Sequence, residues 1–314
     1  MPRYIVSRVG QAVLVLWAAF TASFVLLQAM PGDAVLIKFQ NPDYGLSPEQ
    51  LADIRAAYAT DGSILVQYFR SIGKFLTGDF GVSFKAGVPV STELATNLPA
   101  TLWLAGLGFI TAALLAIVIA VLSNIAGFEK LRAVVQSLPA LLVSVPAFWL
   151  GIMLIHLFSF RFHLVPVINP GPWQGLILPV LTLAVPIAAP MAQILLRNID
   201  EVLTRPFVSV ARAKGAPHGF VLWRHVAKNA ALPVMTVAGV LFGEILSGAV
   251  VTETVFGLNG IGRLTEDSVN SEDVAVLQAI VVISATAFVV INLVVDLLYP
   301  VFDPRLKVAL GGSR

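Results

Sequence analysis

Cysteine is absent from the 314-residue sequence, and charged residues are scarce. Without thiols the chain can form no disulfide, no thiolate metal site and no cysteine nucleophile. Charged residues make up only 12% of the sequence, and hydrophobic residues make up 57%. A soluble domain of this size needs about twice that share of charge to cover its surface. Most of the outer surface must therefore face a medium other than water, and lipid is the simplest such medium.

A large net charge and several functional motifs are missing as well. The formal net charge of +2 provides no field that would attract nucleic acid. The sequence contains no GxxxxGK[ST] phosphate-binding loop, so any ATP must be hydrolysed by another polypeptide. It contains no paired aspartates, no HExxH and no Gly-x-Ser-x-Gly, which argues against an intramembrane enzyme. An ion-coupled transporter or channel usually needs several intramembrane ionisable groups, and only Glu244 and Asp296 qualify. That class is kept as an alternative.

Six long apolar stretches dominate what is present, and the mean hydropathy is +0.87. A hydrocarbon core about 30 Å thick requires about 20 helical residues, so each stretch can hold one span. They lack the alternation of a transmembrane barrel, which predicts an all-α integral membrane protein with about six spanning helices. The first is expected to be a retained anchor rather than a signal peptide. The stretches are Val9–Gly32, Leu94–Phe128, Ala133–Phe160, Phe162–Leu196, Asn229–Thr252 (interrupted by Glu244) and Val274–Val295.

The distribution of basic residues predicts the orientation. With six spans both chain ends lie on the same side, and thirteen of the twenty lysines and arginines fall in the segments of that side. Cytoplasmic segments carry the excess of such residues. We therefore expect a multi-pass protein of the plasma or inner membrane with both termini in the cytoplasm. The basic segments are the amino terminus, 124–132, 197–231 and 301–314, against 31–98, 161–175 and 253–276 on the outer side.

These stretches also predict the domain organisation. We expect an N-terminal transmembrane helix over 1–32, an external loop with short amphipathic helices over 33–93, a core of five spans over 94–300, and a cytoplasmic tail over 301–314. In the external loop, Ser47, Pro48 and Gln50 are typical of a capped helix start. A helical stripe of apolar residues from Ile64 to Leu76 predicts an interfacial helix that lies against the membrane or receives an external partner.

The longest cytoplasmic connection, Arg197 to Ala231, is too long for a simple turn. It predicts two short helices, Phe207–Lys214 and Gly219–Asn229, around a break at Gly215-Ala216-Pro217. Gly215 can adopt a positive φ at little cost, and proline favours a helix start. Such an element can stand out from the membrane and enter a groove on a soluble protein.

Motifs along nearly the whole chain resemble the inner-membrane permeases of ABC importers, in particular the B-type subunits of the dipeptide and oligopeptide permease family. Their order and spacing carry the resemblance more than any single motif does. The motifs are Met30-Pro31-Gly32-Asp33, Gly78-Asp79-Phe80-Gly81, Pro89-Val90, Leu98-Pro99-Ala100-Thr101-Leu102, Ala211-Arg212-Ala213-Lys214-Gly215, Leu222-Trp223-Arg224-His225, Asn229-Ala230, Val251-Thr252-Glu253-Thr254-Val255-Phe256, Gly260-Ile261-Gly262, Asp296-Leu297-Leu298-Tyr299 and Asp303-Pro304-Arg305.

This resemblance implies a type I ABC importer permease that forms half of a translocation path. The implied partners are a second, similar permease subunit, two cytoplasmic ATPases that use ATP and magnesium, and an external solute-binding protein. No cofactor or metal is expected on this chain itself. Di- or oligopeptides are the expected solutes, and the same family also serves nickel chelates, haem and some saccharides. The implied ATPase-coupling residues are Ala211, Arg212, Ala213, Lys214, Gly215, Trp223, Arg224 and His225.

The sequence departs from that family pattern in two places. Ser209 and Lys228 stand where the broad permease signature has an acidic residue and a proline. Glu244 lies in the fifth span, where relatives commonly have small or apolar residues. It is read either as a protonated or hydrogen-bonded packing residue or as part of the solute path. Gln193 is the second residue predicted for that path.

Helix breakers mark two spans. Pro179, Pro186 and Pro190 should kink the fourth. Gly239, Gly243 and Gly248 permit close helix approach in the fifth. Tight bundle packing and bending around a solute path both explain them.

Overall fold

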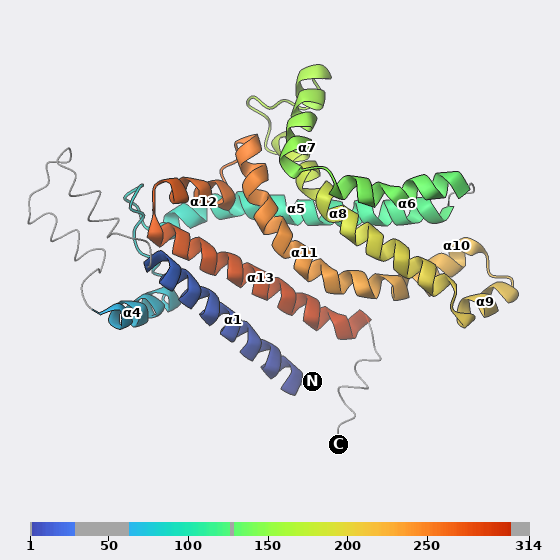
Figure 1. Cartoon of the computed structure of the whole chain (residues 1–314), viewed down its shortest axis with the longest axis horizontal. Helices are drawn as coiled ribbons and strands as arrows, with labels where there is room; N and C mark the ends of the chain where they lie inside the picture. Colours follow the sequence, from blue (N-terminus) through green and yellow to red (C-terminus); the bar gives the residue numbers. More distant parts are fainter. Residues whose placement is uncertain (1, 29–62, 126–128, 303–314) are drawn as a thin grey trace, which may run out of the picture. The chain divides into compact units, whose positions relative to one another are not determined.

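The computed structural model describes residues 2–28, 63–125 and 129–302 (Figure 1). Within these ranges the chain is almost entirely helical, and its only extended pairing is an isolated bridge between Val82 and Pro89. The helices are α1 (Pro2–Gln28), α4 (Ile64–Leu76), α5 (Val90–Ile125), α6 (Glu129–Val143), α7 (Ala147–Leu154), the π-helical turn η2 (Ile155–Arg161), α8 (Gln174–Leu203), α9 (Pro206–Ala213), α10 (His218–Val221), the π-helical turn η3 (Leu222–Val226), α11 (Ala227–Phe256), α12 (Ile261–Asn270) and α13 (Val274–Phe302).

The predicted all-α membrane architecture is confirmed. Five of the described helices are long and apolar enough to span a membrane, and each overlaps one of the first, second, fourth, fifth and sixth predicted stretches. The fourth helix begins at Gln174, twelve residues after the start of its predicted stretch at Phe162. The sixth candidate span is a bent pair of helices. Of the predicted motifs, Met30-Pro31-Gly32-Asp33 and Asp303-Pro304-Arg305 lie outside the described residues, as do Ser47, Pro48 and Gln50.

The third stretch is not the straight helix that its length suggests. It divides into Glu129–Val143 and Ala147–Arg161, which meet at an angle of 104°. The break lies at Ser144-Val145-Pro146, and Pro146 has the extended backbone of a residue that precedes a helix. A residue before proline is pushed out of the helical region, and Val145 is β-branched, so helix α6 ends there. The expected breaker positions in the fourth stretch behave differently, because α8 continues through Pro179, Pro186 and Pro190 without interruption.

The contacts divide the chain into two units, and the boundaries fall within α1, α5 and α13. Unit 1 comprises residues 1–10, 101–258 and 288–314. Its core surrounds α8, which packs against α6, α7 and α11. Alanines and branched aliphatic residues fill this core, among them Leu104, Leu183, Ala188, Leu241 and Ile245.

Small residues set how closely the helices of unit 1 approach. A Cβ atom at Gly108 of α5 would lie 3.0 Å from Cδ2 of Leu183, and one at Gly248 of α11 would lie 3.0 Å from Cδ1 of the same leucine. The Leu183 side chain is 3% exposed. It is therefore held between two glycines from two different helices, and it cannot retreat from one without approaching the other.

The remaining glycines of α11 admit side chains of α13. A Cβ at Gly239 would lie 2.6 Å from Oδ1 of Asn292, and one at Gly243 would lie 2.9 Å from a ring carbon of Phe288. Both contacts lie within unit 1. The prediction that Gly239, Gly243 and Gly248 permit close helix approach is confirmed.

Unit 2 comprises residues 11–100 and 259–287. Helix α4 packs on α1 through aromatic contacts, and the Tyr68 hydroxyl lies 2.7 Å from Thr21 Oγ1. The apolar stripe from Ile64 to Leu76 is thus confirmed as a helix, and its contact with the membrane stays a prediction. Phe69 and Leu76 remain largely exposed.

A buried carboxylate holds the loop before α5 in unit 2. Asp273 precedes α13 and is 1% exposed. It accepts hydrogen bonds from the Ser83 hydroxyl at 2.7 Å and from the backbone N–H of Lys85 at 3.1 Å. Two glycines of this loop, Gly78 and Gly81, have φ of +79° and +83°. Glycine adopts such a backbone at little cost, which explains why the motif around Asp79 has glycine at these two positions.

The leucine held between two glycines can be tested with Gly108→Ala. Because Leu183 has no space to retreat, we expect the added methyl group to destabilise the fold by about 1–3 kcal/mol, as overpacking does. Gly106→Ala is the matched control, because a Cβ at Gly106 meets nothing within 4 Å. Thermal unfolding in detergent measures both. Equal midpoints for the two variants would contradict this packing.

Candidate functional site: the coupling segment

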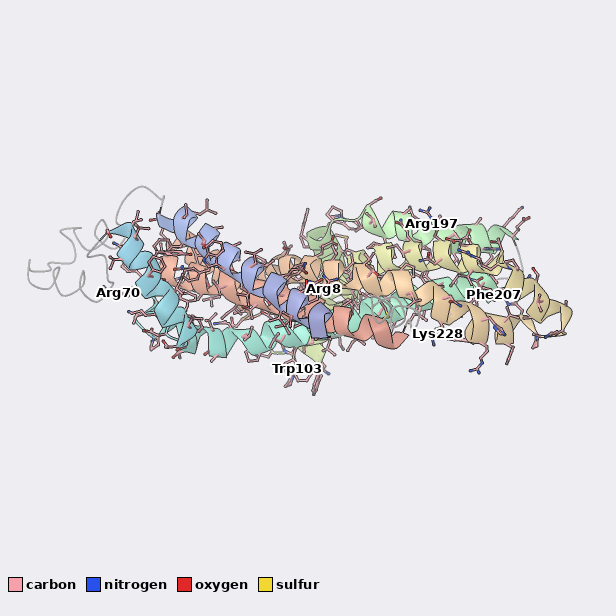
Figure 2. All side chains as sticks on the ribbon, turned by 90° about the horizontal axis from the view of Figure 1, so that it is seen from below. Arg8, Arg70, Trp103, Arg197, Phe207 and Lys228 are labelled. Atoms are coloured by element: carbon pink, nitrogen blue, oxygen red, sulfur yellow. The ribbon has the colours of Figure 1, made fainter. Side chains whose placement is uncertain are left out.

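The segment from Arg197 to Ala231 lies in unit 1 and connects α8 to α11. Figure 1 shows α9 and α10 beyond the adjoining ends of α8 and α11. In Figure 2, Arg197, Phe207 and Lys228 lie toward this end of unit 1, whereas Trp103 lies toward the other end. The segment is therefore an ordered extension of two spanning helices.

Local sequence explains where α9 begins and ends. Arg205 has the extended backbone of an N-terminal cap, and Pro206 occupies the first turn, where its missing N–H costs nothing. At the other end Gly215 has φ of +85°. The Gly215 N–H donates to the Arg212 carbonyl at 2.9 Å, and the Ala216 N–H donates to the Ala211 carbonyl at 3.1 Å. This pair of bonds is the Schellman motif, which requires a left-handed residue at the position of Gly215.

The second predicted helix is not separate from the membrane span, and this corrects the expectation of two short helices. Pro217 precedes α10, which continues through η3 directly into α11. The helical run is continuous from His218 to Phe256. The break at Gly215-Ala216-Pro217 is confirmed, but it divides α9 from a single long helix. The sequence could not indicate this, because the polar residues after Gly219 mask the continuity of the backbone.

Buried residues tie the segment to the core of unit 1. Val208 of α9 is 1% exposed, and Val221, Leu222 and Val226 are buried in the same cluster. The cluster includes Leu196 and Ile199 from the end of α8. Helix α9 is therefore packed into the same core as the end of α8 and the start of the helical run that leads into α11.

The predicted coupling residues lie on the outer surface of this element with two exceptions. Ala211 and His225 are half-buried, and the His225 ring packs edge-on against Phe220 at 5.8 Å between ring centroids. The exposed residues are Arg212, Ala213, Lys214, Gly215, Trp223 and Arg224.

Exposed apolar side chains lie beside the predicted coupling residues, and only Trp223 among them was predicted from the sequence. Phe207, Val210 and Phe220 are 44%, 54% and 52% exposed, and Trp223 is 64% exposed. Gly219, Phe220, Trp223 and Arg224 line a shallow, open groove of about 390 Å³. The signal that could have identified them is the presence of large apolar residues in a predicted cytoplasmic segment.

Positive charge surrounds this apolar surface. From Pro206 to Ala231 the sequence contains Arg212, Lys214, Arg224 and Lys228 and no acidic residue. The only acidic residues of the longer segment, Asp200 and Glu201, bind Arg132 and Arg205. The bond from Arg132 to Asp200 is 2.7 Å long and links α6 to α8. The surface suits a partner that offers an apolar ridge with acidic residues beside it.

Glu244 and Gln193, the two residues predicted for a solute path, lie on α11 and α8. Both are exposed on the surface of this chain. A carboxylate that faces hydrocarbon at mid-membrane costs roughly 2.5–3.5 kcal/mol on insertion scales. Its exposure here means that Glu244 is not a packing residue within the chain.

Two of the sequence motifs meet in unit 1. The hydroxyl of Thr101 donates to Oε1 of Glu253 at 2.6 Å, and the Glu253 side chain is fully buried. The prediction had placed Glu253 in an external loop, whereas it occupies the last turns of α11. Among the described residues no group of three His, Asp or Glu side chains is placed to hold a metal ion.

Comparison with known families and proteins gives consistent matches over the whole chain. Residues 112–308 match the family described as "Binding-protein-dependent transport system inner membrane component", and residues 1–105 match its N-terminal companion family. The chain is 34% identical over 308 residues to the glutathione transport system permease protein GsiC of Salmonella typhimurium (strain LT2). It is 31% identical over 307 residues to GsiC of Escherichia coli (strain K12). Each match covers 98% of this chain and 99% of the relative.

Two solved structures share the fold. A methionine ABC transporter, MetNI in inward-facing conformations, aligns with a TM-score of 0.56 at 16% identity, over 67% of this chain and 96% of that one. An amino acid ABC transporter crystallised with histidines aligns with a TM-score of 0.50 at 19% identity, over 68% of this chain and 94% of that one. The identities are low, so these matches concern the arrangement of helices alone.

The attachment of α9 to the core can be tested with two valines of the same helix. Val208 is 1% exposed and Val210 is 54% exposed. We expect Val208→Ala to lower the local stability of α9 by about 2 kcal/mol through lost burial and a residual cavity. Val210→Ala should have almost no effect. Hydrogen exchange of the amides from Phe207 to Ala216, measured without partner subunits, reports this. Equal protection in the two variants would show that α9 is not anchored through Val208.

Proposed function

The chain belongs to the family of inner-membrane components of binding-protein-dependent transport systems, and from that premise we propose that it carries di- or oligopeptides across the membrane and is driven through α9. It is a permease subunit of an ABC importer, and ATP hydrolysis takes place in separate ATPase subunits. The finer assignments of solute, coupling residues and partners are proposals.

The proposed coupling element is the surface formed by α9, the Gly215 turn and α10 with η3. The observation that carries this role is the burial of Val208 and Val221 beneath exposed Arg212, Lys214, Trp223 and Arg224. A partner that pushes on the exposed residues displaces the ends of α8 and α11 together. Ala211, Ala213 and His225 complete the element by spacing these side chains and supporting Phe220.

The proposed partner at this surface is a cytoplasmic ATPase. The groove beside Trp223 is apolar, and the charges around it are basic, so an apolar ridge flanked by acidic residues is complementary to it. The assembly proposed for transport contains two such ATPases, which bind ATP and magnesium, a second similar permease subunit and an external solute-binding protein. In that assembly this chain forms half of the translocation path.

The proposed orientation places α9 and both chain termini in the cytoplasm. Its support is the excess of lysine and arginine in 197–231 and the other segments of that side. The proposed solute class rests on the glutathione permeases to which the chain is similar over nearly its full length. Glutathione is itself a small peptide, so the similarity favours peptide-like solutes over chelates, haem or saccharides.

The coupling role can be tested at Gly215, whose φ of +85° strains any β-branched residue. We expect Gly215→Val to distort the turn at a cost of about 1–2 kcal/mol and to lower solute-stimulated ATPase activity and uptake roughly five- to thirty-fold. Membrane insertion should be unchanged. Both activities are measured in proteoliposomes that contain the partner subunits.

The control is at the same position. Gly215→Asn keeps a residue that tolerates left-handed backbone and should retain most of the activity. Wild-type coupling in the valine variant, at equal amounts of assembled complex, would refute the role of this turn.

A further inference from the structure

The exposed face of α11 is unusually polar for a membrane span. Between Ala230 and Phe256 the exposed positions follow one another at intervals of three or four residues, which places them on a single helix face. More than half of them carry polar groups, and one carries a carboxylate. The exposed residues are Pro233, Thr236, Val240, Glu244, Ser247, Val251 and Thr254.

Helix α5 provides an internal comparison. In its part from Thr101 to Asn124 every exposed residue is apolar, as a lipid-facing surface requires. These residues are Leu102, Trp103, Ile110, Leu114, Ile117, Val118 and Leu122. Helix α8 shows the opposite tendency, because its only exposed position between Leu178 and Leu196 is Gln193. The exposed residues are thus all apolar in this part of α5, whereas α8 and α11, which pack together, expose polar residues along their spans.

The position of Glu244 shows most clearly that the exposed face of α11 differs from the apolar face of α5. It lies near the middle of α11, so its side chain cannot reach either interface by extending along the helix. No lysine, arginine or histidine occurs from Gln174 to Leu196 or from Asn229 to Phe256. Neither helix therefore supplies a fixed cation to pair with the carboxylate.

We propose that the face of α11 from Pro233 to Thr254 lines the aqueous solute path and that Glu244 binds the cationic group of the solute there. This inference rests on the proposed permease function and adds the chemical class of solute, namely one that carries a free ammonium group. The ammonium group of the solute would supply the positive charge that α8 and α11 lack beside this carboxylate. The hydroxyl of Ser247 offers a hydrogen bond on the same face.

The absence of cysteine from the chain permits a direct test with single cysteines. Ser247→Cys and Val240→Cys lie one helical turn on either side of Glu244. Ile110→Cys and Leu114→Cys on α5 are the matched controls. Each variant is assembled with its partner subunits in proteoliposomes and treated with water-soluble methanethiosulfonates, one with a trimethylammonium group and one with a sulfonate group. Labelling of this chain is followed by mass spectrometry.

We expect the α11 cysteines to react in at least one nucleotide state and the α5 cysteines to remain unlabelled. Glu244→Gln in the same background should lower the ratio of the cationic to the anionic reaction rate at Ser247→Cys by about tenfold, because attraction of one charge and repulsion of the other each contribute about threefold at this separation in water. The intrinsic rates of the two reagents cancel in this comparison.

Three results would overturn the inference. Unreactive α11 cysteines that cross-link to the second permease subunit would show a protein interface. Cysteines that react only with a membrane-permeant maleimide, as the α5 controls should, would show lipid. A cation preference that survives Glu244→Gln would remove the role of the carboxylate. ATP-driven peptide uptake by the complex that contains the unsubstituted chain is measured in parallel, and its absence would refute the proposed function instead.

Discussion

The position of Leu183 between Gly108 and Gly248 determines how closely α5, α8 and α11 can approach. Apolar burial offers little driving force between helices in lipid, so close fit has to supply the stability of a bundle. A side chain confined on two sides also resists sliding of one helix along the others. The three helices are therefore held as one body at this level, and α9 is attached to that body by Val208. The proposed coupling depends on this packing, because a loosely packed bundle would absorb a displacement of α9 instead of passing it on.

Much of this arrangement could be predicted from the sequence, because lipid imposes strict requirements on length and composition. The apolar stretches, the ordered segment from Arg197 to Ala231 and the positive φ of Gly215 each follow from a local rule. Helix continuity was harder to predict. Proline removes one hydrogen bond wherever it stands, yet Pro146 ends a helix and Pro186 does not. A valine precedes both prolines, so the local sequence does not distinguish them. In α8 the neighbouring helices enclose the chain around Pro186, whereas Pro146 is exposed and the backbone there leaves the helical region.

The sequence alone does not distinguish residues that would face a solute path from residues that face lipid. The sequence identifies Glu244 as an exception in its span but does not say which way the helix is rotated. The structure supplies the rotation, because Leu241, Ile245 and Ala249 are buried and thereby orient Glu244 and Ser247 outward. The buried bond from Thr101 to Glu253 is a similar case, since those residues are 152 positions apart in the chain. Only folding shows that this acidic residue is internal.

The continuity of the helix from His218 to Phe256 joins the two functional surfaces. Trp223 belongs to the groove at one end, and Glu244 belongs to the polar face further along the same helix. Their separation in sequence corresponds to about 30 Å along the axis. A flexible hinge between them would dissipate any displacement, but the helix is interrupted only by the widened turn η3, which is next to the groove itself. Beyond that turn Gly239, Gly243 and Gly248 lock the helix to its neighbours. In the proposed function, a movement at the groove reaches Glu244 as a displacement of these packed helices together.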